Sequence, residues 1–200
     1  MKTFMKNFAL PSLFMVVLTT QVSAQNNRSS NTNDRTVKAS GTITKKSIVN
    51  GRVPSNTVTY KTTQKKVVSV RNVPNKTVVP HNNQKYYYAN NKYYMQSSGR
   101  YIPIAPKVGF RIQTLPVNYK KVHFNNYNYF NSNGIFYSQI NNEYEVVDPA
   151  VGTIVYELPA DYEKVVIDGS TYYEYANILY EKVQVDGARA YEVIGIIDME

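Results

Sequence analysis

From about residue 81 onward, apolar and polar positions alternate over short stretches rich in tyrosine and β-branched residues. Examples are Val122-His123-Phe124, Tyr127 to Phe130 and Tyr144 to Val147. A period of two is typical of half-buried β-strands. No window shows the 3.6-residue apolar period with caps that predicts a helix. The pattern therefore predicts short antiparallel strands.

Pairs of turn-forming residues separate these runs. Asn-Gly and Asp-Gly pairs supply the positive φ angles that two-residue hairpin turns require. We expect hairpin turns at Asn90-Asn91, Ser98-Gly99, Asn125-Asn126, Asn133-Gly134, Asn141-Asn142, Asp168-Gly169, Ala176-Asn177 and Asp186-Gly187.

The same unit recurs along the chain. Pro106-Lys107-Val108-Gly109 returns 43 positions later as Pro149-Ala150-Val151-Gly152, and Leu115-Pro116 returns as Leu158-Pro159. The same shift relates Tyr94 to Tyr137 and Tyr180. A shift that holds over many positions indicates an internal repeat of about two and a half copies. The Pro-containing pieces are expected to interrupt the strands, because Pro cannot donate to a central ladder.

The predicted fold is therefore all-β. Tandem short antiparallel hairpins from a repeated unit, residues 81–200, are expected to close as small barrels or to pair as a sandwich. Exposed edge strands can pair between molecules, so the pattern leaves both a monomer and an assembly open.

Residues 25–80 have a different texture. They carry eleven Lys and Arg against one acid, Asp34, and a single aromatic residue, Tyr60. Segments with little apolar surface and high net charge do not offset the entropy of ordering. We expect a basic, mostly disordered arm, in which pieces such as Thr57 to Tyr60 have strand character. Residues 81–200 are mildly acidic, so the basic character belongs to the arm.

Residues 1–24 have the layout of a secretory signal peptide. Lys2 and Lys6 precede an eleven-residue apolar run, Phe8 to Leu18, and Val22 and Ala24 occupy the small-residue cleavage positions. A membrane-spanning helix needs about 20 apolar residues, so this run is too short for an anchor, and no later run is long enough. The absence of cysteine excludes disulfides and a lipoprotein anchor. We expect export to the periplasm, the outer surface or the medium.

Three features together resemble a known family. They are the signal peptide, the Tyr-Tyr-Tyr-x-Asn-x-x-Tyr-Tyr hairpin at Tyr86 to Tyr94, and the Pro-x-Val-Gly, Leu-Pro and Asp168 to Tyr173 elements of the repeat. Over residues 84–194 the chain resembles the DUF6515 type of exported bacterial proteins, common in Bacteroidota, a domain of unknown function. The resemblance implies export and β structure, and it supplies no catalytic residues.

The sequence offers little to catalysis, and we expect no enzyme, no cofactor and no metal site. There is no Cys, and the two histidines are His81, beside Pro80, and His123, which the next copy replaces by Val166. No nucleophile, phosphate-loop or metal-spaced motif appears. The alternative is a small hydrolase that uses paired carboxylates, tested best at Glu174 and Glu181. The candidate acids are Glu143, Glu145, Asp161, Glu163, Glu174 and Glu181.

The 19 tyrosines admit two interpretations. In the structural one, rings on neighbouring strands stack, adding ~0.2–1 kcal/mol per pair. In the functional one, an exposed group of rings forms a platform for glycans or peptidoglycan. The candidate ligand-binding residues are Tyr86, Tyr87, Tyr88, Tyr93, Tyr94 and Tyr101.

The leading hypothesis is a non-enzymatic structural or binding protein of the cell envelope. Its basic arm would attach to anionic envelope polymers or lipid head groups, at ~1 kcal/mol per Lys or Arg near an anionic surface. Nucleic acid would attract the same charges, but export and the lack of a recognition motif argue against it as a partner. A carbohydrate- or peptidoglycan-binding module is the first alternative.

Overall fold

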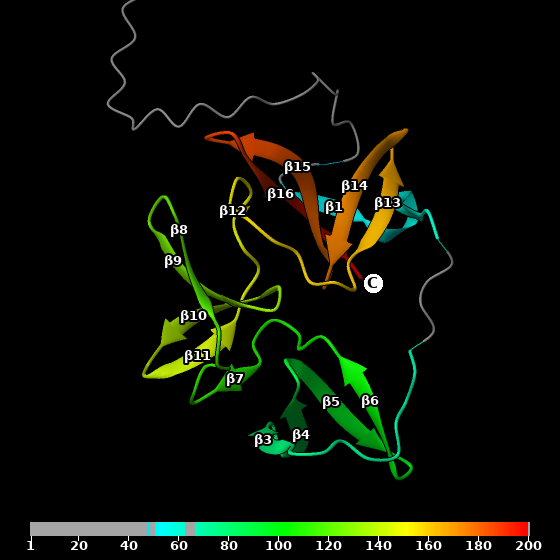
Figure 1. The fold of residues 1–200 in the computed structure, drawn as a ribbon, viewed down its shortest axis with the longest axis vertical. Helices are drawn as coiled ribbons and strands as arrows, with labels where there is room; N and C mark the ends of the chain where they lie inside the picture. The colour runs from blue at the N-terminus through cyan, green and yellow to red at the C-terminus, as the bar shows by residue number, and fades with distance from the viewer. Residues whose placement is uncertain (1–47, 49–50, 63–66, 200) are drawn as a thin grey trace, which may run out of the picture. The chain divides into compact units, whose positions relative to one another are not determined.

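The computed structural model describes residues 48, 51–62 and 67–199, and the predicted signal segment 1–24 lies outside them. The described ranges form sixteen β-strands and one short 3-10 helix, η1 (Ser55–Thr57) (Figure 1). The all-β prediction is therefore confirmed. In these ranges no helix has the length and apolar character needed to cross a membrane.

Three copies of one four-stranded antiparallel meander follow each other along the chain. The first contains β3 (Thr77–His81), β4 (Gln84–Ala89), β5 (Lys92–Ser97) and β6 (Arg100–Ile104). The second contains β8 (Lys120–Phe124), β9 (Tyr127–Ser132), β10 (Ile135–Ile140) and β11 (Glu143–Val146). The third contains β13 (Glu163–Ile167), β14 (Ser170–Tyr175), β15 (Ile178–Val185) and β16 (Ala188–Asp198). The structure thus holds three full copies, because the first reaches back to Thr77.

The turns explain why the meanders form. Backbone φ is positive at both central residues of the turns at Asn90-Asn91, Ser98-Gly99, Asn133-Gly134, Asn141-Asn142, Asp168-Gly169, Ala176-Asn177 and Asp186-Gly187. Such angles match the twist of the flanking strands, and they confirm seven of the eight predicted turns. The eighth, Asn125-Asn126, joins β8 to β9 as predicted, with positive φ at Asn125. A further turn of this kind lies at Asn82-Asn83, between β3 and β4.

Each linker between copies supplies one short strand to the sheet beside it. β7 (Arg111–Ile112) pairs with β11, and β12 (Ile154–Val155) pairs with β16. In the first copy, Val70 takes the corresponding place as a two-way backbone bridge to Tyr101. The Pro-containing linkers interrupt the meander as predicted, and after each interruption the chain adds an edge strand.

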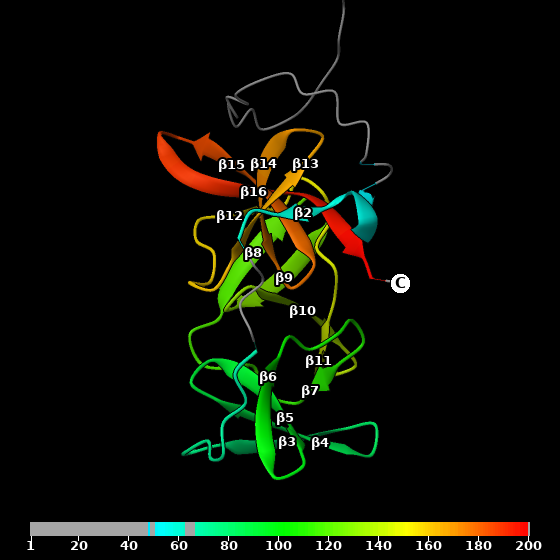
Figure 2. The same ribbon diagram turned by 90° about the vertical axis from the view of Figure 1, so that its right-hand side faces the viewer.

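The second-copy sheet packs against both other sheets (Figure 2). On one side, Ile135, Tyr137 and Val146 share a buried cluster with Tyr93 of β5. On the other, Tyr129 and Phe136 lie in a cluster with Tyr180 and Val193 of the third copy, among others. Because side chains alternate along a strand, one strand such as β10 can serve both cores.

Within residues 25–80, the described ranges depart from the predicted arm. β1 (Arg52–Pro54) runs parallel to β16, and β2 (Thr59–Tyr60) pairs with β13 at the opposite edge of the same sheet. Val53 is fully buried there. With its two edges joined through η1, this sheet curls into a half-barrel (Figure 1). The strand character of Thr57 to Tyr60 is thus realised, and the partner is the chain's own third copy.

Residues 67–80 also belong to the structured part. Val73 is buried against the first-copy sheet with Ala89 and Tyr101, and β3 completes that sheet. The described strands therefore begin upstream of the predicted boundary at residue 81. Local composition missed this because a single buried Val suffices to dock a polar segment onto aromatic rings. Residues 25–47, 49–50 and 63–66 of the predicted arm lie outside the described residues.

Candidate functional site

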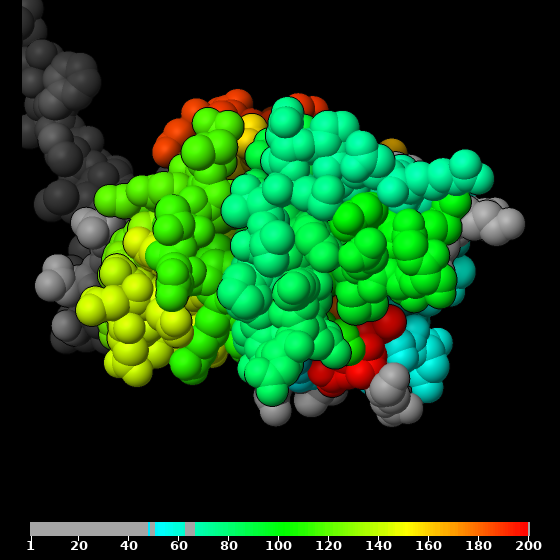
Figure 3. Space-filling model, turned by 90° about the horizontal axis from the view of Figure 1, so that it is seen from below, coloured from blue at the N-terminus to red at the C-terminus, as the bar shows by residue number. Residues whose placement is uncertain are grey.

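Two hollows flank the β4–β5 hairpin of the first copy, which forms much of the face seen in Figure 3. The first, which we term the inter-copy pocket, has a volume of about 500 Å³ and takes lining residues from all three copies. The second, the β3 groove, has a volume of about 1170 Å³ and runs beside β3 and the loop at residues 109–117. Tyr88, Asn91 and Tyr93 line both hollows.

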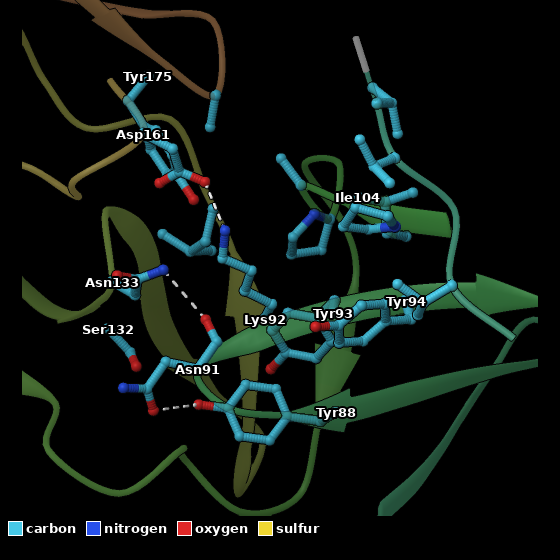
Figure 4. A pocket seen from close by; sticks show the side chains of 18 of the residues that line it. Tyr88, Asn91, Lys92, Tyr93, Tyr94, Ile104, Ser132, Asn133, Asp161 and Tyr175 are labelled. Atoms are coloured by element: carbon cyan, nitrogen blue, oxygen red, sulfur yellow. Dashed lines mark hydrogen bonds and ion pairs between the residues drawn. The ribbon is translucent and has the colours of Figure 1, made fainter. Parts of the chain in front are cut away.

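Hairpin ends converge on the inter-copy pocket. Asn91 and Lys92 lie at the β4–β5 turn, Asn133 lies at the β9–β10 turn, and Asp161 and Tyr175 come from the third copy (Figure 4). Positive φ at Asn91 and Asn133 holds these turns tight.

Polar contacts join the three copies at this point. The Asn133 side-chain amide donates to the Asn91 carbonyl over 3.0 Å. The Tyr88 hydroxyl donates to Asn91 Oδ1 over 3.2 Å. Lys92 Nζ lies 2.8 Å from Asp161 Oδ2 (Figure 4). The Lys92 and Asp161 side chains remain 44% and 39% exposed, so this ion pair adds only ~0–1 kcal/mol of stability and both charges stay accessible to a ligand.

The Tyr88, Tyr93 and Tyr175 phenols at the pocket have raised pKa values and are neutral in ordinary conditions. Burial raises the pKa of Tyr88, and it raises the pKa of Tyr93 to about 12. Burial, together with the nearby Asp161 carboxylate, also raises the pKa of Tyr175. These hydroxyls therefore act as hydrogen-bonding groups. With amides, an ammonium, carboxylates and ring faces, the pocket presents groups suited to a polar, uncharged or zwitterionic ligand.

The six candidate tyrosines do not share one face. Tyr86, Tyr88 and Tyr93 pack toward the second copy, whereas Tyr87, Tyr94 and Tyr101 pack with Val73 on the other side of the sheet. Consecutive residues of a strand point to opposite faces, so a run of adjacent tyrosines is divided between the two. Tyr93 and Tyr101 are only 5% and 8% exposed. The structure brings three of the six, Tyr88, Tyr93 and Tyr94, to the inter-copy pocket.

The candidate carboxylates are dispersed. Glu143 and Glu145 border the β3 groove, where Glu145 Oε2 accepts from Arg111 Nε over 2.7 Å. Asp161 and Glu163 line the inter-copy pocket. Glu174 lines neither hollow, and Glu181 lies in β15.

Glu174 is 8% exposed and accepts the Asn177 backbone N–H over 2.8 Å. Burial raises its pKa, the Asn177 hydrogen bond opposes this, and the neighbouring Glu163 adds to the rise. Its contacts are those of a carboxylate that closes the β14–β15 turn.

The histidines lie apart from the inter-copy pocket. His81 Nδ1 accepts the Arg111 backbone N–H, and its ring lies 4.7 Å from that of Phe110. His123 Nδ1 lies 2.8 Å from Asn128 Oδ1 on the neighbouring strand. In the described ranges, no three acidic or histidine side chains are grouped to hold a metal ion.

Sequence reasoning missed Asn91, Lys92 and Asn133 of the pocket. The signal that marks Lys92 is a departure from the repeat. The same position holds Ile135 in the second copy and Ile178 in the third, and both are buried. A lysine in place of two core isoleucines identifies a position that the first copy uses differently.

The model of the DUF6515 family, a family of unknown function, matches residues 57–197. The match includes β2 and all three copies of the meander. No match was found among the curated proteins or among the solved structures.

Proposed function

Since the chain belongs to the DUF6515 family, for which no activity is described, we propose that it is an exported, non-enzymatic binding protein of the cell envelope. We assign glycan or peptidoglycan binding to the inter-copy pocket. The observation that carries the proposal is the composition of that pocket, where the half-buried rings of Tyr88 and Tyr94 lie beside Asn91, Asn133 and the Lys92–Asp161 pair.

This set of groups is the one that sugars require. Apolar sugar faces pack on tyrosine rings, and hydroxyl and acetamido groups bond to side-chain amides and carboxylates. Each Asn amide has two donors and one acceptor, so the contacts within the pocket leave further groups for a ligand. A volume of about 500 Å³ lies within the range of small-molecule sites, roughly 300–1,000 Å³.

A non-enzymatic role is favoured over hydrolysis by the states of the acids. Asp161 is held by Lys92, and Glu145 is held by Arg111. Glu174, the acid whose pKa burial raises, lines neither hollow. A general acid needs a raised pKa and contact with the reacting bond, and these two properties fall on different residues here.

The binding proposal is tested by calorimetric titration of the full chain with muropeptides and chito-oligosaccharides. The informative variant is Lys92→Ile, because Ile occupies this position in the other two copies and so suits the fold. Losing the ammonium should weaken binding at least ten-fold. Lys85→Asn is the matched control. It likewise removes a lysine of the β4–β5 hairpin and introduces the residue of the second copy, but Lys85 lies in β4, outside both hollows. If the wild type retains no glycan, or if both variants bind like it, the assignment fails.

A second proposal concerns the basic N-terminal stretch, which we assign to electrostatic attachment to anionic polymers. Deleting all of residues 25–80 would remove β1, β2 and most of β3. The cleaner variant replaces the five Lys and Arg of residues 25–47 by Gln. Sedimentation with vesicles containing anionic lipid should show wild-type binding that falls steeply with salt and is lost in the variant. Binding that ignores salt would contradict the assignment.

A further inference from the structure

Each copy of the meander has one outer strand that follows a linker: β3, β8 and β13. Each is joined to the next strand by a two-residue turn. In such a hairpin the two residues that flank the turn form main-chain hydrogen bonds to each other. The next residue away from the turn directs its backbone N–H and C=O outward, away from the partner strand, and the pattern repeats every second residue. The outward residues are Val78 and Pro80 in β3, Lys121 and His123 in β8, and Lys164 and Val166 in β13.

The outward row of β13 is occupied. Thr59 of β2 lies opposite Val166 of β13, and the Lys61 backbone N–H donates to the Lys164 carbonyl over 2.9 Å. An extended segment has therefore added itself to the sheet edge through main-chain hydrogen bonds. This edge shows that the outer strand of the repeat is competent to accept a strand.

The outward row of β3 is blocked. Pro80 stands where β13 has Val166, and Pro has no N–H to donate. A proline at an outward position spares the hairpin's own hydrogen bonds while preventing strand addition. The edge of the first copy is thus protected by a proline that lacks an N–H, and the edge of the third copy is covered by an added strand.

The outward row of β8 retains its donors and acceptors. Within the described part of the chain, neither Lys121 nor His123 has a backbone hydrogen bond to anything beyond β9. Lys120, Lys121 and His123 are exposed. Lys120 is paired with Glu157 over 2.6 Å, which leaves the Lys121 charge at the centre of the row.

That charge selects the occupant. Two molecules of this protein joined through their β8 edges would bring their lysines close together, and like charges facing each other across a sheet are destabilising. The basic N-terminal stretch is disfavoured for the same reason. We propose that the β8 edge is a docking site for an extended acidic segment of another protein, which adds a strand beside β8 and places carboxylates near Lys121. The edge shares no residue with the inter-copy pocket.

The test uses the full chain and two synthetic peptides of alternating β-branched and charged residues, one with Glu and one with Lys. NMR titration, which detects weak binding, follows the β8 amides. The acidic peptide should shift Lys121 and His123, and the basic peptide should bind at least ten-fold more weakly. His123→Pro copies the first-copy residue Pro80, so the fold tolerates it at this position, and it should abolish the shifts.

Lys121→Glu provides a second variant that leaves the backbone row intact. It should invert the preference, so that the basic peptide binds more tightly than the acidic one. The proposal is overturned if the wild type binds neither peptide, if both bind equally, or if His123→Pro binds like the wild type. If neither peptide binds, Lys120 and Lys121 serve only to prevent β8 edges of two molecules from pairing.

Discussion

Gly134→Ala tests the packing between the second and third copies. Gly134 lies in the β9–β10 turn with φ +80°, and a Cβ built on it would lie 2.6 Å from Tyr175 Cδ1 and 2.7 Å from Pro159 Cγ. Gly169, in the β13–β14 turn, has φ +76° and nothing within 4 Å of its built Cβ. The two glycines share the backbone conformation and differ in their surroundings, so Gly169→Ala is the matched control.

The expected magnitudes follow from two costs. An L-residue in the left-handed region costs ~1–2 kcal/mol, partly offset by ~0.4–1 kcal/mol from the stiffer unfolded chain. Gly169→Ala should therefore destabilise by about 0.5–1 kcal/mol. Gly134→Ala adds overpacking against Tyr175 and Pro159, about 1–3 kcal/mol. The difference between the two variants isolates this second cost.

The assay is urea unfolding at fixed temperature, followed by far-UV circular dichroism. The unfolding midpoint should fall clearly further for Gly134→Ala than for Gly169→Ala, with little change in slope, because the surface exposed on unfolding is nearly the same. Equal losses in the two variants would refute the contact between the β9–β10 turn and the third copy. Since Tyr175 lines the inter-copy pocket, Gly134→Ala should also weaken any ligand bound there.

Three further predictions concern buried titratable groups. The Tyr137 hydroxyl donates to that of Tyr93 over 3.0 Å in the core. Tyr137→Phe should lower the free energy of unfolding by ~1–3 kcal/mol, because the buried Tyr93 hydroxyl loses its partner. In a double-mutant cycle measured by denaturation, the variant with Phe at both positions should recover part of this loss. Burial raises the Tyr93 pKa from 10.0 to about 12, so its contribution to stability is complete below pH 10 and is lost as the pH rises toward 12; absorbance at 295 nm should show late-titrating tyrosines that ionise together with unfolding. Glu174 also has a raised pKa, so its contribution to stability is complete below pH 4.5 and is lost as the pH rises through its folded pKa. Glu174→Gln keeps an acceptor for the Asn177 N–H, and in urea unfolding it should be more stable than the wild type by an amount that grows above pH 4.5. A difference that stays constant with pH would contradict burial as the cause.

Local signals in the sequence were sufficient for the meanders. The turn pairs at Asn133-Gly134 and Asp186-Gly187 fix positive φ through the residues themselves, and the repeat then places the strands. Non-local pairing could not be read in the same way. The segment Thr57 to Tyr60 has strand character, but nothing in it specifies Val165 and Val166 as its partners. Such partners depend on the curl of the completed sheet.

The candidate site was predicted in part for a similar reason. Composition drew attention to the tyrosines near Tyr86 to Tyr94, and three of the six do reach the pocket. It could not separate them, because a run such as Tyr86-Tyr87-Tyr88 sends alternate rings to two different cores. Asn133 and Asp161 enter from the other copies, and their convergence is a property of packing.

The place of the first copy in the array explains why the site forms there. The equivalent tyrosines Tyr137 and Tyr180 are almost fully buried, whereas Tyr94 is only half-buried. In a repeat array, a terminal unit has a neighbour on one side and must make its free face polar or put it to use. The first copy does so at Lys92, where the other copies need a buried Ile. A repeat that keeps its turns and core can vary such positions without loss of fold, and we therefore expect binding specificity to reside in them.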